Sequence, residues 1–248
     1  MTSWTALESE LEQWEAAGLK PCLWWRDDDA QAVTPALERL LHLSQTYGVP
    51  AHISVIPEGL QPDLAPRLRD TDHAYVLQHG LRHINHEPKD RPASEVGETR
   101  DLALQRADLQ KGWDILETSG MPKLITALVP PWNRIGDATR RSLPDWGYDF
   151  LSAYEGRGDA AAIPGLTHID AHLDPIRWKY DRVFRGEGKM LGMFLEHLQD
   201  RRLNNPKKPI GYVTHHLQTS DAIWDFSDSL FSATRGMWAS VPDMQKGT

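Results

Sequence analysis

The stretch Pro21-Cys-Leu-Trp-Trp-Arg26 runs directly into Asp27-Asp28-Asp29, so a short apolar segment ends in three adjacent carboxylates. The length of the segment and its large apolar side chains predict a buried strand. Neighbouring carboxylates repel one another, and an apolar strand leading into them leaves little room for water around all three. A bound cation or a nearby Arg would relieve that cost, whereas a solvated turn is the ordinary alternative.

The same alternation of a short strand-like run and a helix-like stretch continues along the chain. Further strands are expected at 49–56, 73–77, 123–129, 148–152, 167–173 and 210–214. Helices are expected at 4–17, 34–48, 94–118, 137–143 and 189–202. This alternation predicts a mainly parallel sheet, as either a distorted barrel or an open doubly wound sheet. In both architectures functional side chains gather at the carboxyl ends of the strands.

Two histidines follow the strand expected at 73–77, in the segment His79-Gly-Leu-Arg-His83. Histidines four residues apart lie on one face of a helix, so a helical turn here would let both imidazoles reach one metal ion. Two neutral histidines and a carboxylate form a common catalytic zinc set, with positions left open for water and substrate. A chance pair is the alternative in a chain with eleven histidines, and His86 is interpreted as a surface residue.

Other polar and aromatic residues also lie at or just past the ends of expected strands. They are Pro131-Trp132, the stretch 170–174 and His215-His216. Residues scattered at random would not favour strand ends so consistently, so these positions are candidates for one shared site. The chain also has ten tryptophans. Most are expected in the core, but indole rings stack on sugars as well, which slightly favours a carbohydrate ligand.

The order of these motifs resembles that of the polysaccharide deacetylase family (NodB homology, carbohydrate esterase family 4). An Asp-Asp pair follows the first strand, His-x-x-x-His the third and a Pro-aromatic turn the fourth, and a late strand ends in His. The segment 48–55 also looks like the family's second strand, and the similarity extends over roughly 23–217. It implies a distorted (β/α)7 barrel and a hydrolase that removes an acetyl group from an N-acetylated sugar or a related small amide.

The resemblance also implies roles for residues of the first two motifs. In the family, the earlier aspartate of the pair is the general base and the later one binds a divalent metal ion. These positions are matched to Asp28 and Asp29, although Asp27 with Asp28 stays open, and Asp27 is the expected bystander. His79 and His83 match the other two metal ligands. Zinc is the first expectation for the ion, and manganese, cobalt or nickel are alternatives.

Two later motifs supply the remaining catalytic groups that the resemblance implies. Trp132, in the Pro-aromatic turn, would donate its backbone N–H to the oxyanion and form a wall of the substrate groove. His215 would be the general acid that protonates the leaving amine. His216 competes for this role, but side chains alternate along a strand, so only one of the two histidines should face the site.

This chain departs from the family's pattern in two places. Val129 replaces the family's Arg that pairs with the catalytic aspartate, so Arg26 or Arg134 would have to take over its role. The family's Asp-and-Trp motif is matched only loosely, by Asp174-Pro-Ile-Arg-Trp178. Trp178 is therefore a second substrate-binding candidate.

Composition narrows the class of protein. The 248 residues are interpreted as one domain, with residues 1–18 as an N-terminal helical extension. A net charge of −8 argues against nucleic acid as a partner. Cys22 is the only cysteine, which excludes an intramolecular disulfide and a cysteine-based zinc site. With no secretion signal and no apolar run near the roughly 20 residues of a membrane span, a cytoplasmic protein is expected.

The expected partner is a small-molecule or carbohydrate substrate, and the sequence does not indicate an oligomeric state. Two other functions stay open: a hydrolase of a non-sugar carbon–nitrogen amide bond, and a catalytically inactive carbohydrate-binding relative. The presence of both Asp28 and His215 argues against the inactive relative, because a binding protein needs neither a base nor an acid.

Overall fold

The computed structural model describes residues 3–155, 162–179 and 182–246. Its centre is one sheet of seven parallel strands in the order β6-β5-β4-β3-β2-β1-β9. These strands are β1 (Leu23–Ala30), β2 (Ala51–Val55), β3 (Ala74–Gln78), β4 (Leu124–Leu128), β5 (Phe150–Leu151), β6 (Thr167–His168) and β9 (Ile210–Thr214). A separate antiparallel hairpin consists of β7 (Ile176–Arg177) and β8 (Val183–Phe184). The predicted parallel sheet is confirmed.

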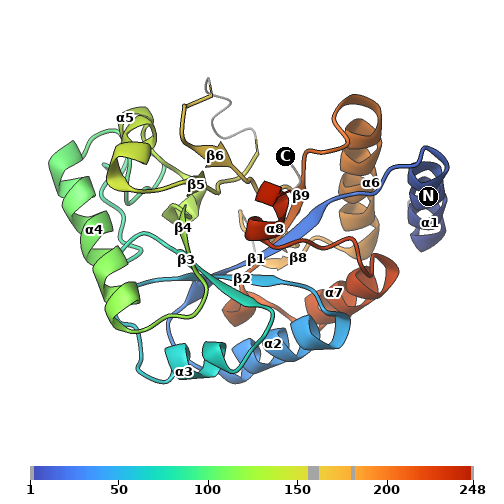
Figure 1. The fold of residues 1–248 in the computed structure, drawn as a ribbon, viewed down its shortest axis with the longest axis horizontal. Coiled ribbons are helices and arrows are strands. Elements are labelled where there is room, and N and C mark those ends of the chain that lie inside the picture. The colour runs from blue at the N-terminus through green and yellow to red at the C-terminus, as the bar shows by residue number, and fades with distance from the viewer. Residues whose placement is uncertain (1–2, 156–161, 180–181, 247–248) are drawn as a thin grey trace.

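Helices surround the outside of this sheet (Figure 1). The α-helices are α1 (Trp4–Ala16), α2 (Pro35–Tyr47), α3 (Leu64–Arg69), α4 (Leu102–Thr118), α5 (Asp137–Ser142), α6 (Glu187–Asn204), α7 (Asp221–Ala233) and α8 (Val241–Lys246). Short 3-10 turns are η1 (Pro131–Asn133), η2 (Pro144–Trp146) and η3 (His216–Gln218). The N-terminal α1 lies outside α6 and is joined to it by the ion pair of Glu10 with Arg202. Within the described ranges, no helix has the length and apolar character needed to cross a bilayer.

The barrel is closed by the chain that leaves β6, which crosses to the far edge strand β9. Leu173 donates its N–H to the carbonyl oxygen of Gly211 (3.0 Å), and Val213 donates its N–H to the carbonyl oxygen of Leu173 (2.9 Å). The close passage requires a glycine, because a Cβ at Gly211 would fall 2.5 Å from a backbone oxygen of the crossing segment. The result is the distorted seven-stranded barrel that the family resemblance implies, and not an open doubly wound sheet.

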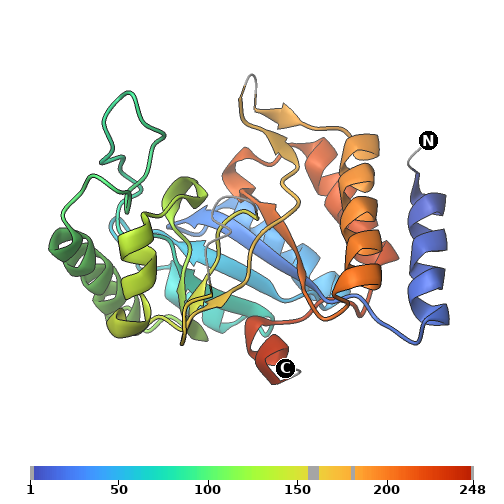
Figure 2. The same ribbon diagram turned by 90° about the horizontal axis from the view of Figure 1, so that it is seen from above.

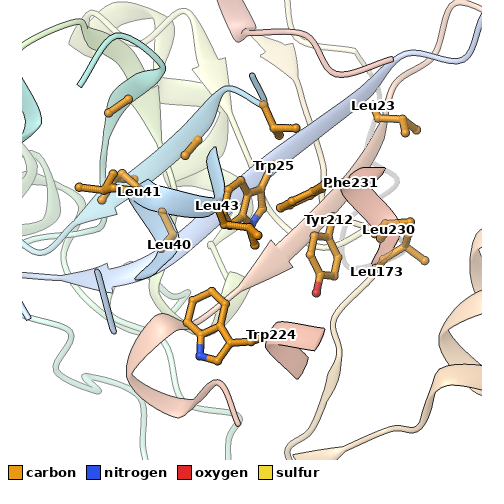
Figure 3. Packing of buried hydrophobic residues seen from close by; sticks show 14 of the residues in the cluster. Leu23, Trp25, Leu40, Leu41, Leu43, Leu173, Tyr212, Trp224, Leu230 and Phe231 are labelled. Carbon is orange, nitrogen blue, oxygen red and sulfur yellow. The ribbon is translucent and has the colours of Figure 1, made fainter. Parts of the chain in front are cut away.

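The main hydrophobic core lies between the strands β1, β2 and β9 and the helices α2, α6 and α7. Figure 3 shows Trp25 of β1 beside Phe231 of α7 and Tyr212 of β9. The rings of Trp25 and Phe231 are 4.7 Å apart. β1 is buried along almost its whole length, as expected for a strand that is paired on both sides and covered on both faces. This packing fixes the strand that ends in the three aspartates.

Local signals define α2 as the sequence predicts. Thr34 accepts the N–H of Leu37 as an N-cap, and Pro35 occupies the first helical position. Gly48 ends the helix in the left-handed region, at φ 65°. The buried leucines of this helix face the core.

Other predictions were wrong in extent. The helix expected at 94–118 begins only at Leu102, because the carboxylate of Asp101 caps it by accepting the N–H of Ala103. The preceding residues form a loop that is tied to the chain after η1 by a bridge between Val96 and Ile135. The strands expected at 148–152 and 167–173 shrink to two residues each. The helices α3, α7 and α8 and the β7–β8 hairpin were not predicted.

The two ends of the barrel have different roles. The long loops and the β7–β8 hairpin project from one side, and α8 lies on the other (Figure 2). There His52 donates from Nδ1 to the carbonyl oxygen of Trp25 (2.7 Å) and accepts at Nε2 the N–H of Val241 (3.0 Å). Burial lowers the pKa of His52 to about 4. α8 therefore covers the amino ends of the strands, which leaves the carboxyl ends for the site.

Candidate metal and active site

Asp29, His79 and His83 meet at the carboxyl ends of β1 and β3. Oδ1 of Asp29 lies 3.2 Å from Nε2 of His79 and 3.5 Å from Nε2 of His83. Each residue offers one ligand atom, and the three atoms lie within 4.8 Å of one another. The structure thus brings together the three ligands predicted from the sequence, whereas His86 is not part of this group.

A bulge in β1 directs Asp29 into the site. Side chains alternate along a strand, so Asp28 and Asp29 would normally point to opposite sides. Asp29 instead has φ 75°, and the pairing of β1 with β2 shifts between Asp27 and Ala30. A bulge of this kind re-aims a side chain beside a functional site. It lets the two adjacent carboxylates serve one site.

The immediate surroundings of these three residues favour a cation. Nδ1 of His79 donates to the carbonyl oxygen of Val129 (2.8 Å), so in the neutral ring Nε2 carries the lone pair that faces Asp29. Oδ1 of Asp29 is buried and accepts no hydrogen bond from the described part of the chain. Burial raises the pKa of Asp29, but when the neighbouring rings are protonated a hydrogen bond and positive charge from His79, with the charges of His215 and His83, hold the pKa well below its usual range. With neutral rings, a divalent ion would supply that positive charge. A carboxylate oxygen and ring lone pairs that point at one another fit a divalent ion between them.

The helical turn expected at His79–His83 was wrong. The segment is an irregular loop in which Gly80 and His83 both have φ 58°. A Cβ at Gly80 would fall 2.0 Å from Oε2 of Glu95 and 2.8 Å from the ring of Pro131, so only glycine fits. The two imidazoles converge because of this loop conformation, and not because they share a helix face.

From the sequence, Arg26 and Arg134 were both possible ion-pair partners of Asp28. The partner in the structure is Arg26. Nε of Arg26 lies 3.0 Å from Oδ1 of Asp28, and Nη2 donates to Oδ2 at 3.0 Å. The guanidinium also donates to Oδ1 of Asn133 (2.6 Å) and to Oγ of Ser152 (2.7 Å). Burial raises the pKa of Asp28, but the charge of Arg26, together with those of His79 and His215, outweighs burial and lowers the pKa. Arg134 donates instead to a backbone oxygen of the loop before α4.

The adjacent histidines after β9 have separate partners. Nε2 of His215 lies 3.8 Å from Oδ2 of Asp28, at the site. Nδ1 of His216 instead contacts Oδ1 of Asp27 at 2.6 Å. Asp27 is fully buried and also accepts a hydrogen bond from Thr214 (2.6 Å). The solvated-turn alternative for the acidic run is therefore wrong, and Asp27 links β1 to β9 and η3.

Two tryptophans border the site. The ring of Trp132 lies 4.2 Å from that of His83, and the ring of Trp178 lies 4.6 Å from that of His215. Trp178 donates from Nε1 to Oδ2 of Asp174 (2.6 Å), a carboxyl whose pKa is raised by burial. The loosely matched Asp-and-Trp motif thus places its tryptophan against the candidate acid.

Sequence reasoning missed three polar residues that support the site. Asn133 and Ser152 bind Arg26, and Glu95 binds the backbone of the histidine loop. Asn133 directly follows the predicted Pro-aromatic turn, which is a usable signal. Glu95 lies in the segment that was mistaken for a helix, so no local pattern pointed to it.

No family model and no curated protein sequence matches this chain. Solved structures do match. A candidate polysaccharide deacetylase from Mycobacterium smegmatis superposes with a TM-score of 0.67 at 13% identity, over 93% of this chain and 90% of that chain. A deacetylase designated T48, solved with substrate, gives 0.58 at 17% identity over 94% of both chains. A carbohydrate esterase family 4 pseudoenzyme from Bacillus anthracis gives 0.52 at 16% identity, over 92% of this chain and 62% of that chain. The predicted polysaccharide deacetylase fold is confirmed.

Proposed function

We propose that this chain is a metal-dependent hydrolase that removes the acetyl group from an N-acetylated sugar or a related small amide. The observation that carries the proposal is the meeting of Asp29, His79 and His83 beside the pair Asp28 and His215. These residues supply a metal-binding set, a carboxylate base and an imidazole acid at one point of the barrel. The fold shared with deacetylases supports the same chemistry.

The donor set fits zinc first. Two imidazole nitrogens and one carboxylate oxygen are a common catalytic zinc set, and they also accept manganese, cobalt or nickel. The carbonyl oxygen of Val129 holds His79 in the orientation that outer partners give to ligand histidines. A divalent ion bound here would acidify a water molecule and polarise the amide carbonyl.

Asp28 is the proposed general base. Arg26 contacts both carboxylate oxygens of Asp28 and helps to lower the pKa of Asp28, so Asp28 is ionised near neutral pH. Each oxygen keeps a further lone pair that can accept the proton of the attacking water. Arg26 thus orients the base from the same strand, in place of the arginine that the family carries at the position of Val129.

His215 is the proposed general acid. Its Nε2 lies near Asp28, where the leaving amine would need a proton, and Trp178 packs against its ring. Trp132 is proposed to donate its backbone N–H to the oxyanion of the tetrahedral intermediate. The hydrogen bond from Arg26 to Asn133 supports this assignment, because it fixes the turn that carries Trp132.

Metal analysis and acetate release test the proposal together. Purified protein should hold about one divalent ion per chain and release acetate from some members of a panel of N-acetylated sugars and small non-sugar amides. His215→Gln should keep the metal and lose turnover by about 10²–10⁴-fold, the usual contribution of a general acid. Metal-free protein contradicts the proposal. Protein that binds metal and sugar but releases no acetate would instead be an inactive binding relative.

A further inference from the structure

Glu95 is a buried carboxylate for which the proposed reaction has no use. Its side chain is 1% exposed and lies in the loop between β3 and α4. Oε2 accepts the N–H of Leu81 (3.1 Å) and of His83 (3.3 Å), and Oε1 accepts the N–H of Arg82 (2.8 Å). One carboxylate therefore binds three consecutive backbone amides of the loop that carries both histidine ligands.

This loop needs an outside acceptor. It belongs to no helix or strand, so its N–H groups lack the partners that regular structure provides. His83 is a non-glycine residue at φ 58°, a conformation that persists only where the surroundings hold it. Hydrogen bonds from amides to an ionised carboxylate are stronger than those to a neutral oxygen. Glu95 can thus hold His83 in a backbone conformation that it would not keep by itself.

The segment around Glu95 also reaches the second loop of the site. Ser94 donates from Oγ to the carbonyl oxygen of Arg134 (2.9 Å), and Val96 bridges to Ile135. Both contacts follow directly after the turn of Trp132, whose ring packs on His83. Residues 94–96 therefore fasten the histidine loop to the loop that carries the candidate oxyanion donor.

We propose that Glu95 is the positioning residue of this site, and that its three amide hydrogen bonds set the spacing of the His79 and His83 imidazoles and thereby the metal affinity. The inference rests on the proposed function, because it takes these histidines as ligands. Glu95 itself contacts neither their ring nitrogens nor Asp29 in the described contacts. It acts through the backbone.

Glu95→Gln tests this role while keeping the size of the side chain. The carboxamide of glutamine turns an N–H₂ group toward backbone N–H donors, so at least one of the three hydrogen bonds is lost. Zinc affinity, measured by competition with a chelator at 25 °C, should fall by about 10–100-fold, as for other outer partners of metal ligands. Hydrogen exchange in the metal-free protein should show faster exchange of the amides of Leu81, Arg82 and His83.

Glu10→Gln is the matched control. Glu10 is 2% exposed and pairs with Arg202 on α6, at the outer side of the molecule. This variant should lose stability but keep wild-type zinc affinity and wild-type exchange in the histidine loop. An equal loss of affinity in Glu10→Gln would show that general destabilisation controls metal binding, and would overturn the role of Glu95.

The remaining outcomes separate the inference from the function. Wild-type protein that binds no divalent ion contradicts the proposed function. Wild-type protein that binds zinc, with Glu95→Gln binding it equally tightly, overturns only the inference. If Glu95→Gln does not fold, Glu95→Asp replaces it: the shorter carboxylate keeps the charge but cannot reach all three amides. It should give an intermediate affinity, and an unchanged affinity again overturns the inference.

Discussion

Two clusters in this chain have the same composition, two histidines and one carboxylate, but different surroundings. The metal cluster consists of Asp29, His79 and His83, and the clasp cluster consists of Glu155, His172 and His197. In the clasp cluster, Oε2 of Glu155 lies 3.3 Å from Nε2 of His172 and 3.9 Å from Nδ1 of His197. These distances are close to those of the metal cluster. Yet among the described residues only the metal cluster brings three ligand atoms within 4.8 Å of one another.

The clasp cluster contains its own cations. Arg201 and Lys208 approach Oε1 of Glu155 at 2.8 and 2.6 Å. His172 accepts the N–H of Gly211 at Nδ1 (2.9 Å), so the proton of the neutral ring is on Nε2 and faces Glu155. A protonated nitrogen and two side-chain cations already satisfy this carboxylate. In the metal cluster, by contrast, no Lys or Arg side chain pairs with Asp29 among the described residues, and the neutral ring of His79 would present a lone pair to it. A bound ion would therefore supply the positive charge there.

The largest expected effect separates the two clusters directly. His79→Ala should lower zinc affinity by more than about 100-fold, because even outer partners of metal ligands are worth about 10–100-fold. His172→Ala is the control, since His172 and His79 are both 2% exposed. It should reduce thermal stability and leave zinc affinity unchanged. Competition with a chelator measures the affinity, and equal losses in the two variants would remove the distinction between the clusters.

The sequence predicts which residues form the metal cluster better than it predicts the backbone geometry that brings them together. The spacing of the motifs singles out Asp29, His79 and His83, and the structure brings these residues together. The four-residue spacing of the histidines, however, suggests a helix where the structure has a loop. Arg26 was predictable from the alternation of side chains, because it lies two residues before Asp28 on the same strand. Glu95 was not, since its contacts with the histidine loop span 12 to 14 residues without a periodic pattern.

In the fold, too, local patterns were predictable from the sequence and long-range contacts were not. The strands from β1 to β4 are short, mostly buried segments that contain apolar runs, and they were predicted within a few residues of their ends. The helix α7 carries Ile223, Trp224, Phe226 and Leu230 at helical spacing, so a local signal for it existed. The closure of the barrel depends on backbone hydrogen bonds between Leu173 and β9, about 40 residues away. No local periodicity encodes such a contact, which is why the strand expected at 167–173 was too long.

A third buried histidine, His52, lies in neither cluster and should make the stability of the fold depend on pH. Both ring nitrogens of His52 bond to backbone, and its pKa is lowered from 6.5 to about 4. Between these values the unfolded chain binds a proton that the folded chain does not, so stability falls as the pH falls from 6.5 to 4. The loss should be about 3 kcal/mol.

Chemical denaturation at a series of pH values measures this effect. His52→Gln keeps a donor and an acceptor but does not titrate, so its stability should change less than that of the wild type across this window. Parallel curves for the two proteins would show that His52 is not held neutral, and α8 would then not be docked through it.

Metal removal should give a somewhat smaller effect. A ligand at a free concentration 100 times its Kd stabilises the folded state by about 2.7 kcal/mol. For a chain of this size that corresponds to a rise in Tm of about 5–10 °C. Zinc should therefore raise the Tm of the wild type, and a chelator should reverse the rise. His172→Ala should show the same rise from its lower starting Tm, and a zinc-induced rise in His79→Ala would place the ion outside the metal cluster.

The smallest effect should come from the clasp cluster at low pH. The contact with His172 lowers the pKa of Glu155 well below its usual range, and Lys208 and Arg201 add to this against the opposing effect of burial. A carboxyl with a lowered pKa stabilises the fold above its unfolded value of 4.5, and this stabilisation is lost as the pH falls below 4.5. Because Glu155 is one-quarter exposed, screening should limit the effect to less than about 1 kcal/mol.

Glu155→Gln should therefore be less stable than the wild type at pH 7, and the difference should shrink below pH 4.5 and at high salt. Zinc affinity at pH 7 should be equal in the two proteins, because the cations of the clasp cluster belong to the chain. Urea denaturation at two salt concentrations measures the first result, and chelator competition measures the second. A stability difference that grows on acidification would mean that Glu155 is not held ionised by its neighbours. A loss of zinc affinity would mean that the two clusters are coupled through the barrel. The difference between them could then not be explained by the immediate surroundings of each cluster.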